Sequence, residues 1–188
     1  MSSTKFIAIL PQPTQPGDKV QISGKISDDA KEFSINFANE VNENPQSIAY
    51  QFKWDLANNV LNEACKENDE WMKDKETQFD TLDGRFKTHL THANKANTND
   101  ILSKGFLNTN SVMNTTDAFV NSNSYSLLGP EFALEFAFQD DGIYVYLVCE
   151  DGRNYITQFQ PESDFQYIES IQVWGDVEKI THLSFSYN

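Results

Sequence analysis

Apolar and polar side chains alternate along much of the chain, and this period of two is typical of half-buried β-strands. The clearest stretch lies between positions 48 and 56. There the alternation places one set of side chains on one face and a second set on the other: Ile48, Tyr50, Phe52, Trp54 and Leu56 against Ala49, Gln51, Lys53 and Asp55. The pattern predicts a strand with one face in a core and one polar face toward solvent.

Shorter alternating or apolar runs recur before and after this strand. They predict further strands over residues 20–26, 33–37, 60–65, 132–138, 143–149, 155–159, 168–174 and 180–187. Turn residues such as Asp140-Asp141-Gly142 and Asp151-Gly152 separate them, and no long helical period is present. The chain is therefore expected to be all-β, an antiparallel β-sandwich of two packed sheets. The side chains expected between the sheets include Phe52, Trp54, Phe136, Val145 and Ile171.

The pattern fades between about 78 and 126, where Asn, Thr and Ser dominate. We interpret this stretch as an insertion in a single domain that spans residues 1–188. Residues 100–107 are compatible with one or two helical turns capped by Asn99, although Gly105 disfavours a helix. The pattern leaves open whether the insertion is ordered.

The amino-acid composition argues against nucleic-acid binding and membrane association. The chain has 188 residues and a formal charge of −14, with 28 acidic and 14 basic residues and no run of Lys or Arg. Phosphate backbones and anionic lipids attract basic patches, so neither nucleic acid nor a membrane is an expected partner. The apolar run from Phe6 to Leu10 is too short for a signal peptide or a membrane span. We expect a cytoplasmic protein, for which an extracellular role would require export without a signal peptide.

Catalytic and metal-binding motifs are weak. Cys65 and Cys149 are far apart, and the pair His89 and His92 has no third ligand nearby, so no disulfide framework, metal or cofactor is expected. The sequon at Asn114 matters only in the secretory pathway. Carboxylates such as Asp140 and Asp141 fall in turns, where Asp is favoured, so no catalytic residues are assigned and the chain is not expected to be an enzyme.

Several short motifs occur in a characteristic order. They are Gly17-Asp18-x-Val20-x-Ile22-x-Gly24, the segment from Phe33 to Phe37, the turn Asp151-Gly152 before Phe159, and Ile171-x-Val173-x-Gly175-Asp176-Val177. Together they resemble the carbohydrate-recognition domain of the galectins, a family of β-galactoside lectins. The resemblance covers nearly the whole chain outside the insertion, and it implies a jelly-roll sandwich that binds sugar on the polar face of one sheet.

The resemblance also implies where the sugar would bind. The family's site contains a strand with His-x-Asn-x-Arg, then an Asn, then a Trp followed by a Glu and an Arg. At the corresponding positions this chain has Gln51, Lys53 and Asp55, then Asn62, Trp71, Asp74 and Glu76. An indole stacks on the apolar face of a galactose ring, but a carboxylate cannot replace the forked donors of Arg. Altered specificity and weak lactose binding are expected.

Each of these residues also has a structural interpretation. Trp71 is compatible with a core position, Asn62 with a turn, and Gln51, Lys53 and Asp55 with an ordinary solvated strand face. The leading hypothesis is a non-catalytic galectin-like lectin whose partners are glycans or glycoproteins. The alternative is a galectin-fold protein-interaction module that has lost sugar binding and uses the same face or the insertion.

Overall fold

The structure is a computed structural model that describes residues 4–79, 88–91 and 130–188. In this part of the chain there are twelve strands and one short 3-10 helix: β1 (Thr4–Ile9), β2 (Lys19–Ile26), β3 (Glu32–Ala38), β4 (Ile48–Asp55), β5 (Val60–Glu67), β6 (Glu70–Phe79), β7 (Thr88–Thr91), β8 (Glu131–Gln139), β9 (Gly142–Cys149), β10 (Gly152–Phe159), η1 (Phe165–Tyr167), β11 (Ser170–Gly175) and β12 (Val177–Ser186). None of the described helices is long and apolar enough to span a membrane.

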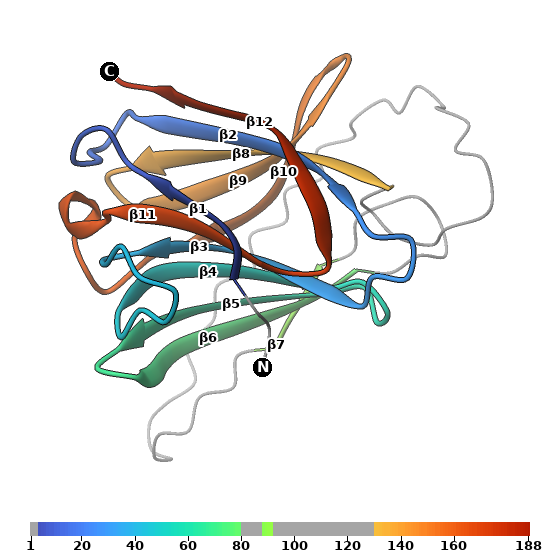
Figure 1. The fold of residues 1–188 in the computed structure, drawn as a ribbon, viewed down its shortest axis with the longest axis horizontal. Helices are drawn as coiled ribbons and strands as arrows, with labels where there is room; N and C mark the ends of the chain where they lie inside the picture. The colour runs from blue at the N-terminus through green and yellow to red at the C-terminus, as the bar shows by residue number, and fades with distance from the viewer. Residues whose placement is uncertain (1–3, 80–87, 92–129) are drawn as a thin grey trace, which may run out of the picture.

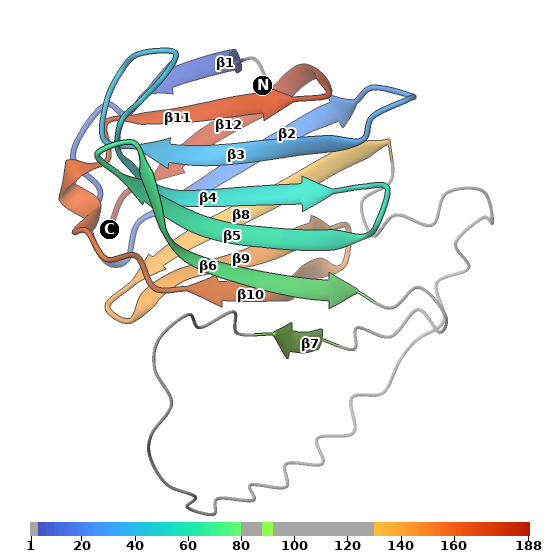
Figure 2. The same ribbon diagram turned by 90° about the horizontal axis from the view of Figure 1, so that it is seen from below.

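The strands form two antiparallel sheets that lie face to face (Figures 1 and 2). The seven-stranded sheet has the order β1-β11-β3-β4-β5-β6-β7, and the five-stranded sheet has the order β10-β9-β8-β2-β12. Strands distant in sequence are neighbours in space, because β11 lies between β1 and β3 while β2 lies between β8 and β12. The predicted fold class, an antiparallel β-sandwich, is confirmed.

The core lies between the sheets. The five side chains predicted to fill it, from Phe52 to Ile171, are all fully buried. Phe136 of β8 packs edge-on against Phe37 of β3 and Phe52 of β4, with ring centroids 4.9 and 5.8 Å apart. Each large apolar side chain buried in this way contributes roughly 1.5–3 kcal/mol, so the residues packed between the sheets are a main source of the stability of the fold.

The prediction for Ile48 is wrong, because β4 contains a bulge at Ala49. Residue 37 of β3 pairs with Tyr50 and Ala38 pairs with Ile48, so Ala49 is left unpaired. The bulge adds one residue to the strand and reverses which face the preceding side chain occupies. Ala49 therefore joins the core beside Tyr50, whereas Ile48 is buried on the opposite face of the sheet.

Three strands were missed from the sequence, β1, β6 and β7. The first two residues of the stretch interpreted as an insertion belong to the sheet, because Gln78 and Phe79 pair with β7 at the end of β6. Phe79 is buried and stacks on Trp54 with ring centroids 5.0 Å apart. Most of the remaining stretch, with the helical turns expected at 100–107, His92 and Asn114, lies outside the described residues.

Candidate functional site

The polar face predicted for β4 continues across the neighbouring strands, and we call it the outer face of the seven-stranded sheet. Pairing places Ser34, Lys53, Asn62 and Glu76 in one row across β3, β4, β5 and β6. A second row contains Asn36, Gln51, Ala64 and Asp74. Paired residues in an antiparallel sheet project to the same side. The register therefore brings five of the seven predicted site residues together on three adjacent strands.

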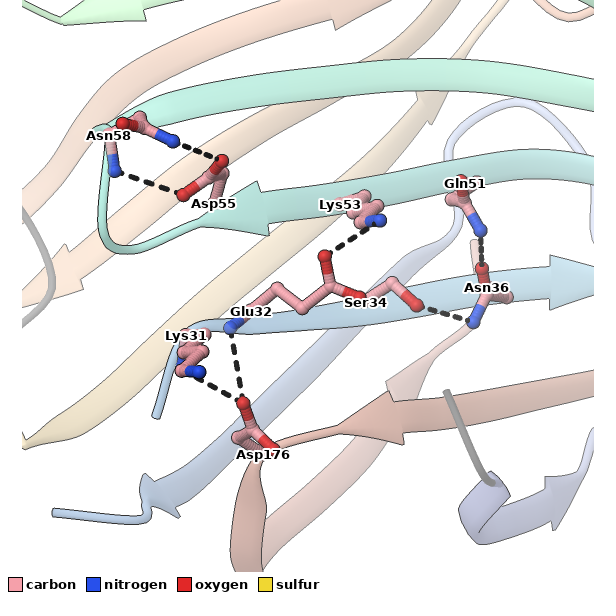
Figure 3. Close-up of polar contacts among 9 residues, drawn as sticks. All are labelled: Lys31, Glu32, Ser34, Asn36, Gln51, Lys53, Asp55, Asn58 and Asp176. Atoms are coloured by element: carbon pink, nitrogen blue, oxygen red, sulfur yellow. Dashed lines mark hydrogen bonds and ion pairs between the residues drawn. The ribbon is translucent and has the colours of Figure 1, made fainter. Parts of the chain in front are cut away.

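Gln51 lies on this outer face as predicted. The prediction that its side chain is accessible to solvent is wrong. Its exposed fraction is only 8%. Its Nε2 donates to Oδ1 of Asn36 at 2.8 Å, and Nδ2 of Asn36 donates to Ser34 Oγ at 3.1 Å (Figure 3). Nδ2 of Asn36 also donates to the carbonyl of Gln172 at 3.3 Å. A buried amide must satisfy its polar atoms within the protein. Gln51 is thus part of a fixed network that supports the sheet.

Lys53 and Asp55 are half-buried, and each has a partner beside it (Figure 3). The Lys53 ammonium pairs with Glu32 of β3, with 2.9 Å between Nζ and Oε2. The Asp55 carboxylate accepts from the backbone and side-chain nitrogens of Asn58 at 2.9 and 2.8 Å. The side-chain hydrogen bond from Asn58 is the main reason that the pKa of Asp55 lies below its ordinary value. Asp55 therefore shapes the β4–β5 turn.

Trp71 is not a core residue, because 49% of its surface is exposed. It pairs with Lys66 of β5, whose ammonium lies 6.0 Å from the centroid of the indole ring. The same ammonium contacts Oδ1 of Asp69 at 2.7 Å and the carbonyl of Pro45 at 2.9 Å. The tryptophan buried in the core is Trp54. An exposed indole on a polar sheet face is a surface on which a ligand can stack.

A bulge in β6 brings Trp71 and Asp74 to the same face. Residues three apart in a regular strand point to opposite sides of a sheet. In β6, Trp71 pairs with Lys66 and Asp74 pairs with Ala64. A step of three residues along β6 therefore corresponds to a step of two residues along β5, which defines a bulge. The additional residue lies between Trp71 and Asp74. Without it, either the indole or the carboxylate would point into the core.

Asn62, Asp74 and Glu76 are the remaining predicted residues. Asn62 is half-buried on β5, directly opposite Glu76 on β6, and the side chains of Asp74 and Glu76 are exposed. Within the described ranges neither carboxylate forms an ion pair. Asn62 is in a strand and not in a turn. Together with Trp71, these side chains make the accessible part of the candidate site.

The loop between β3 and β4 covers the other end of the outer face. Oγ of Ser170 donates to the carbonyl of Glu40 at 2.6 Å, and Nε2 of Gln172 donates to the carbonyl of Asn42 at 2.8 Å. Ser170 and Gln172 are fully buried as a result. Beside them Trp174, which we did not predict as part of this face, is half-buried and donates from Nε1 to Gln172 Oε1 at 3.1 Å. The accessible region is therefore centred on β5 and β6.

A hollow of about 410 Å³ lies at a different place in the fold, where the β8–β9 turn meets the segments 14–16 and 160–166. Thr14, Asp140, Gln160, Asp164 and Phe165 are among its lining residues. None of the seven predicted site residues contributes to it. The candidate site on the outer face is thus an open surface supported by strands.

Comparison with known proteins agrees with this architecture. Lectin domains are among the proteins built as a two-sheet jelly-roll sandwich, and an exposed indole is a surface on which a sugar ring can stack. The sequence profile of the galactoside-binding lectin family matches residues 5–185, and the chain is therefore a member of the galectin family. No match was found among curated protein sequences.

Solved galectin structures share the fold at low identity. Sheep galectin-11 in complex with glycerol superposes with a TM-score of 0.60 at 11% identity and covers 96% of each chain. Chicken galectin 2 gives 0.58 at 16% identity, with 97% of this chain and 99% of that chain covered. A double variant of human galectin-16 gives 0.59 at 17% identity, with both chains fully covered. Galectins are carbohydrate-binding proteins, which agrees with the expectation of a lectin.

Proposed function

We propose that this protein is a non-catalytic lectin that binds a glycan on the outer face of the seven-stranded sheet. The observation that carries the proposal is the exposed indole of Trp71 on that face. A pyranose ring has an apolar C–H surface that packs on an aromatic ring, while its hydroxyls need donors and acceptors at the edge. Asn62, Asp74 and Glu76 supply such groups in the adjacent pairs of β5 and β6.

The specificity is expected to differ from that of ordinary β-galactoside binding. Asp55 and Glu76 stand where the family resemblance implies two Arg residues, and the ammonium of Lys53 is already paired with Glu32. Arg provides up to five donors in a fixed geometry, whereas an ionised carboxylate is an acceptor only. The face has therefore lost donors that would hold the acceptor oxygens of a neutral galactoside.

One observation favours the alternative of a protein-interaction module. Gln51, Lys53 and Asp55 are all bound to neighbouring side chains, as expected for a face that no longer contacts sugar. A glycan array combined with a lactose titration separates the two functions. Binding of any glycan class that is lost in Trp71→Ala supports the lectin function. An empty array, together with capture of a protein that Trp71→Ala no longer binds, supports the alternative.

A further inference from the structure

The accessible part of the outer face has more acceptors than donors. Asp74 and Glu76 lie two residues apart on β6 and point to the same side, where each has an exposed carboxylate. Neither carboxylate has an ion-pair partner in the part of the chain that is described. Because an ionised carboxylate only accepts hydrogen bonds, a ligand here must provide donors, and positive charge on the ligand would be stabilised.

The two lysines that the structure describes on this face are already neutralised. Lys53 pairs with Glu32 at 2.9 Å, and Lys66 pairs with Asp69 at 2.7 Å. Lys66 also donates to the carbonyl of Pro45. Using either ammonium for a ligand would require an existing ion pair to break. The two exposed carboxylates of β6 therefore set the charge that a ligand meets.

These carboxylates do not stand alone, because the bulge in β6 puts the exposed indole of Trp71 on the same side. Indole rings attract cations to their faces as well as stacking on sugar rings. The ammonium of Lys66 lies 6.0 Å from the centroid of this ring. In the same row Ala64 lies between Asp74 and Gln51 of β4, and its side chain is only a methyl group.

We propose that the preferred ligand is a glycan with a free, protonated amino group, that is, a hexosamine residue that is not N-acetylated. The inference rests on the lectin function proposed above and specifies its ligand class. The ammonium of the amino sugar donates to Asp74 and Glu76, while the C–H face of the ring stacks on Trp71 and a hydroxyl contacts Asn62. The formal charge of −14 adds a long-range attraction for such a cation.

Isothermal titration calorimetry with three related disaccharides tests this specificity. The probes are lactose, N-acetyllactosamine and lactosamine that lacks the N-acetyl group. We expect lactosamine to bind at least tenfold more tightly than either neutral sugar, and we expect added salt to reduce this preference because it screens exposed charges. The double variant Asp74→Asn/Glu76→Gln should lose the preference. The double variant Asp151→Asn/Glu162→Gln makes the same charge change at exposed positions elsewhere and should keep it.

The outcomes separate the ligand class from the lectin function. Equal affinity for the three sugars, or a preference that survives Asp74→Asn/Glu76→Gln, overturns the amino-sugar assignment and leaves a neutral-glycan lectin. Tetralysine that competes as well as lactosamine also overturns it, because the face would then recognise basic peptide and not sugar. If no sugar binds here and a broad glycan array is also empty, the proposed lectin function fails together with this inference.

Discussion

Glu63 of β5 and Lys75 of β6 form an ion pair inside the sandwich, with 3.0 Å between Oε2 and Nζ. Glu63 is fully buried. Its carboxylate also accepts from Tyr50 Oη at 2.8 Å and from Thr157 Oγ1 at 2.7 Å. Lys75 donates in turn to Thr157 Oγ1 at 2.6 Å and to the carbonyl of Gln158 at 2.9 Å. Because Thr157 and Gln158 belong to β10, this network joins the two sheets.

Removing only the lysine should destabilise the fold strongly. In Lys75→Met the Glu63 carboxylate stays buried without its counter-charge, which costs roughly 3–5 kcal/mol for buried pairs. The control is Lys25→Met, because Lys25 forms a surface pair with Glu178 at 2.6 Å, and exposed pairs contribute little to stability. Urea denaturation measures both variants. Similar losses for the two variants would show that the buried pair does not stabilise the sandwich.

The same carboxylate predicts a pH dependence. Burial is the main cause that raises the pKa of Glu63 above its ordinary value, opposed by Lys75 and the hydrogen bonds. Between the unfolded pKa and this raised folded pKa, the folded state binds more protons than the unfolded state, so stability falls as pH rises. Glu63→Gln lacks this titrating group. We expect the unfolding free energy of the wild type, relative to that of Glu63→Gln, to fall as pH rises between these two pKa values. A difference between the two proteins that stays constant with pH would contradict this prediction.

Lactose should bind weakly or not detectably. The family resemblance implies Arg at two positions that are occupied here by Asp55 and Glu76. Each lost charged hydrogen bond costs roughly 1.5–3 kcal/mol, so two together lower the affinity by roughly two to four orders of magnitude. Calorimetry at millimolar lactose checks this. A tight lactose complex that is lost in Trp71→Ala would contradict the argument from these substitutions.

The fold could be predicted because its main signal is local. Alternation from Phe52 to Asp55 identifies a core face and a polar face without any knowledge of the partner strands. Ile48 was placed wrongly because a bulge depends on pairing with β3 and β5, which a single strand does not reveal. Strand β6 was missed for a related reason, since its own bulge disrupts the period of two.

The candidate site was predictable only in part. The family resemblance selected Trp71 and Asp74, and the β6 register explains how both reach one face. The partners of Lys53 and Asp55 were not predicted, because Glu32 comes from another strand and Asn58 acts through turn geometry. Glu63 was missed although it lies between Leu61 and Cys65 in the core alternation, which is a local signal for a buried charge.

A side chain at Gly142 should destabilise the β8–β9 hairpin. Its φ of 142° disfavours other residues, and a Cβ there would lie 2.6 Å from the carbonyl oxygen of Phe159. Gly152 has a similar φ of 137°, but a Cβ at that position would meet no other atom within 4 Å. Gly142→Ala should therefore lose more stability than Gly152→Ala, by roughly 1 kcal/mol or more. Equal melting temperatures for the two variants would show that the β10 backbone moves aside freely.

Trp71 provides the most direct test of lectin against interaction module. Its ring is half exposed, so Trp71→Ala should leave the melting temperature nearly unchanged, whereas Trp54→Ala should cost roughly 3–5 kcal/mol through the cavity it leaves in the core. Glycan binding should disappear in Trp71→Ala and be retained in Trp71→Phe, which keeps an aromatic surface. A large drop in melting temperature in Trp71→Ala would contradict the stacking role, because the indole would then be supporting the fold. An unchanged melt with unchanged glycan binding would move the sugar site away from β6, since no stacking surface would remain there.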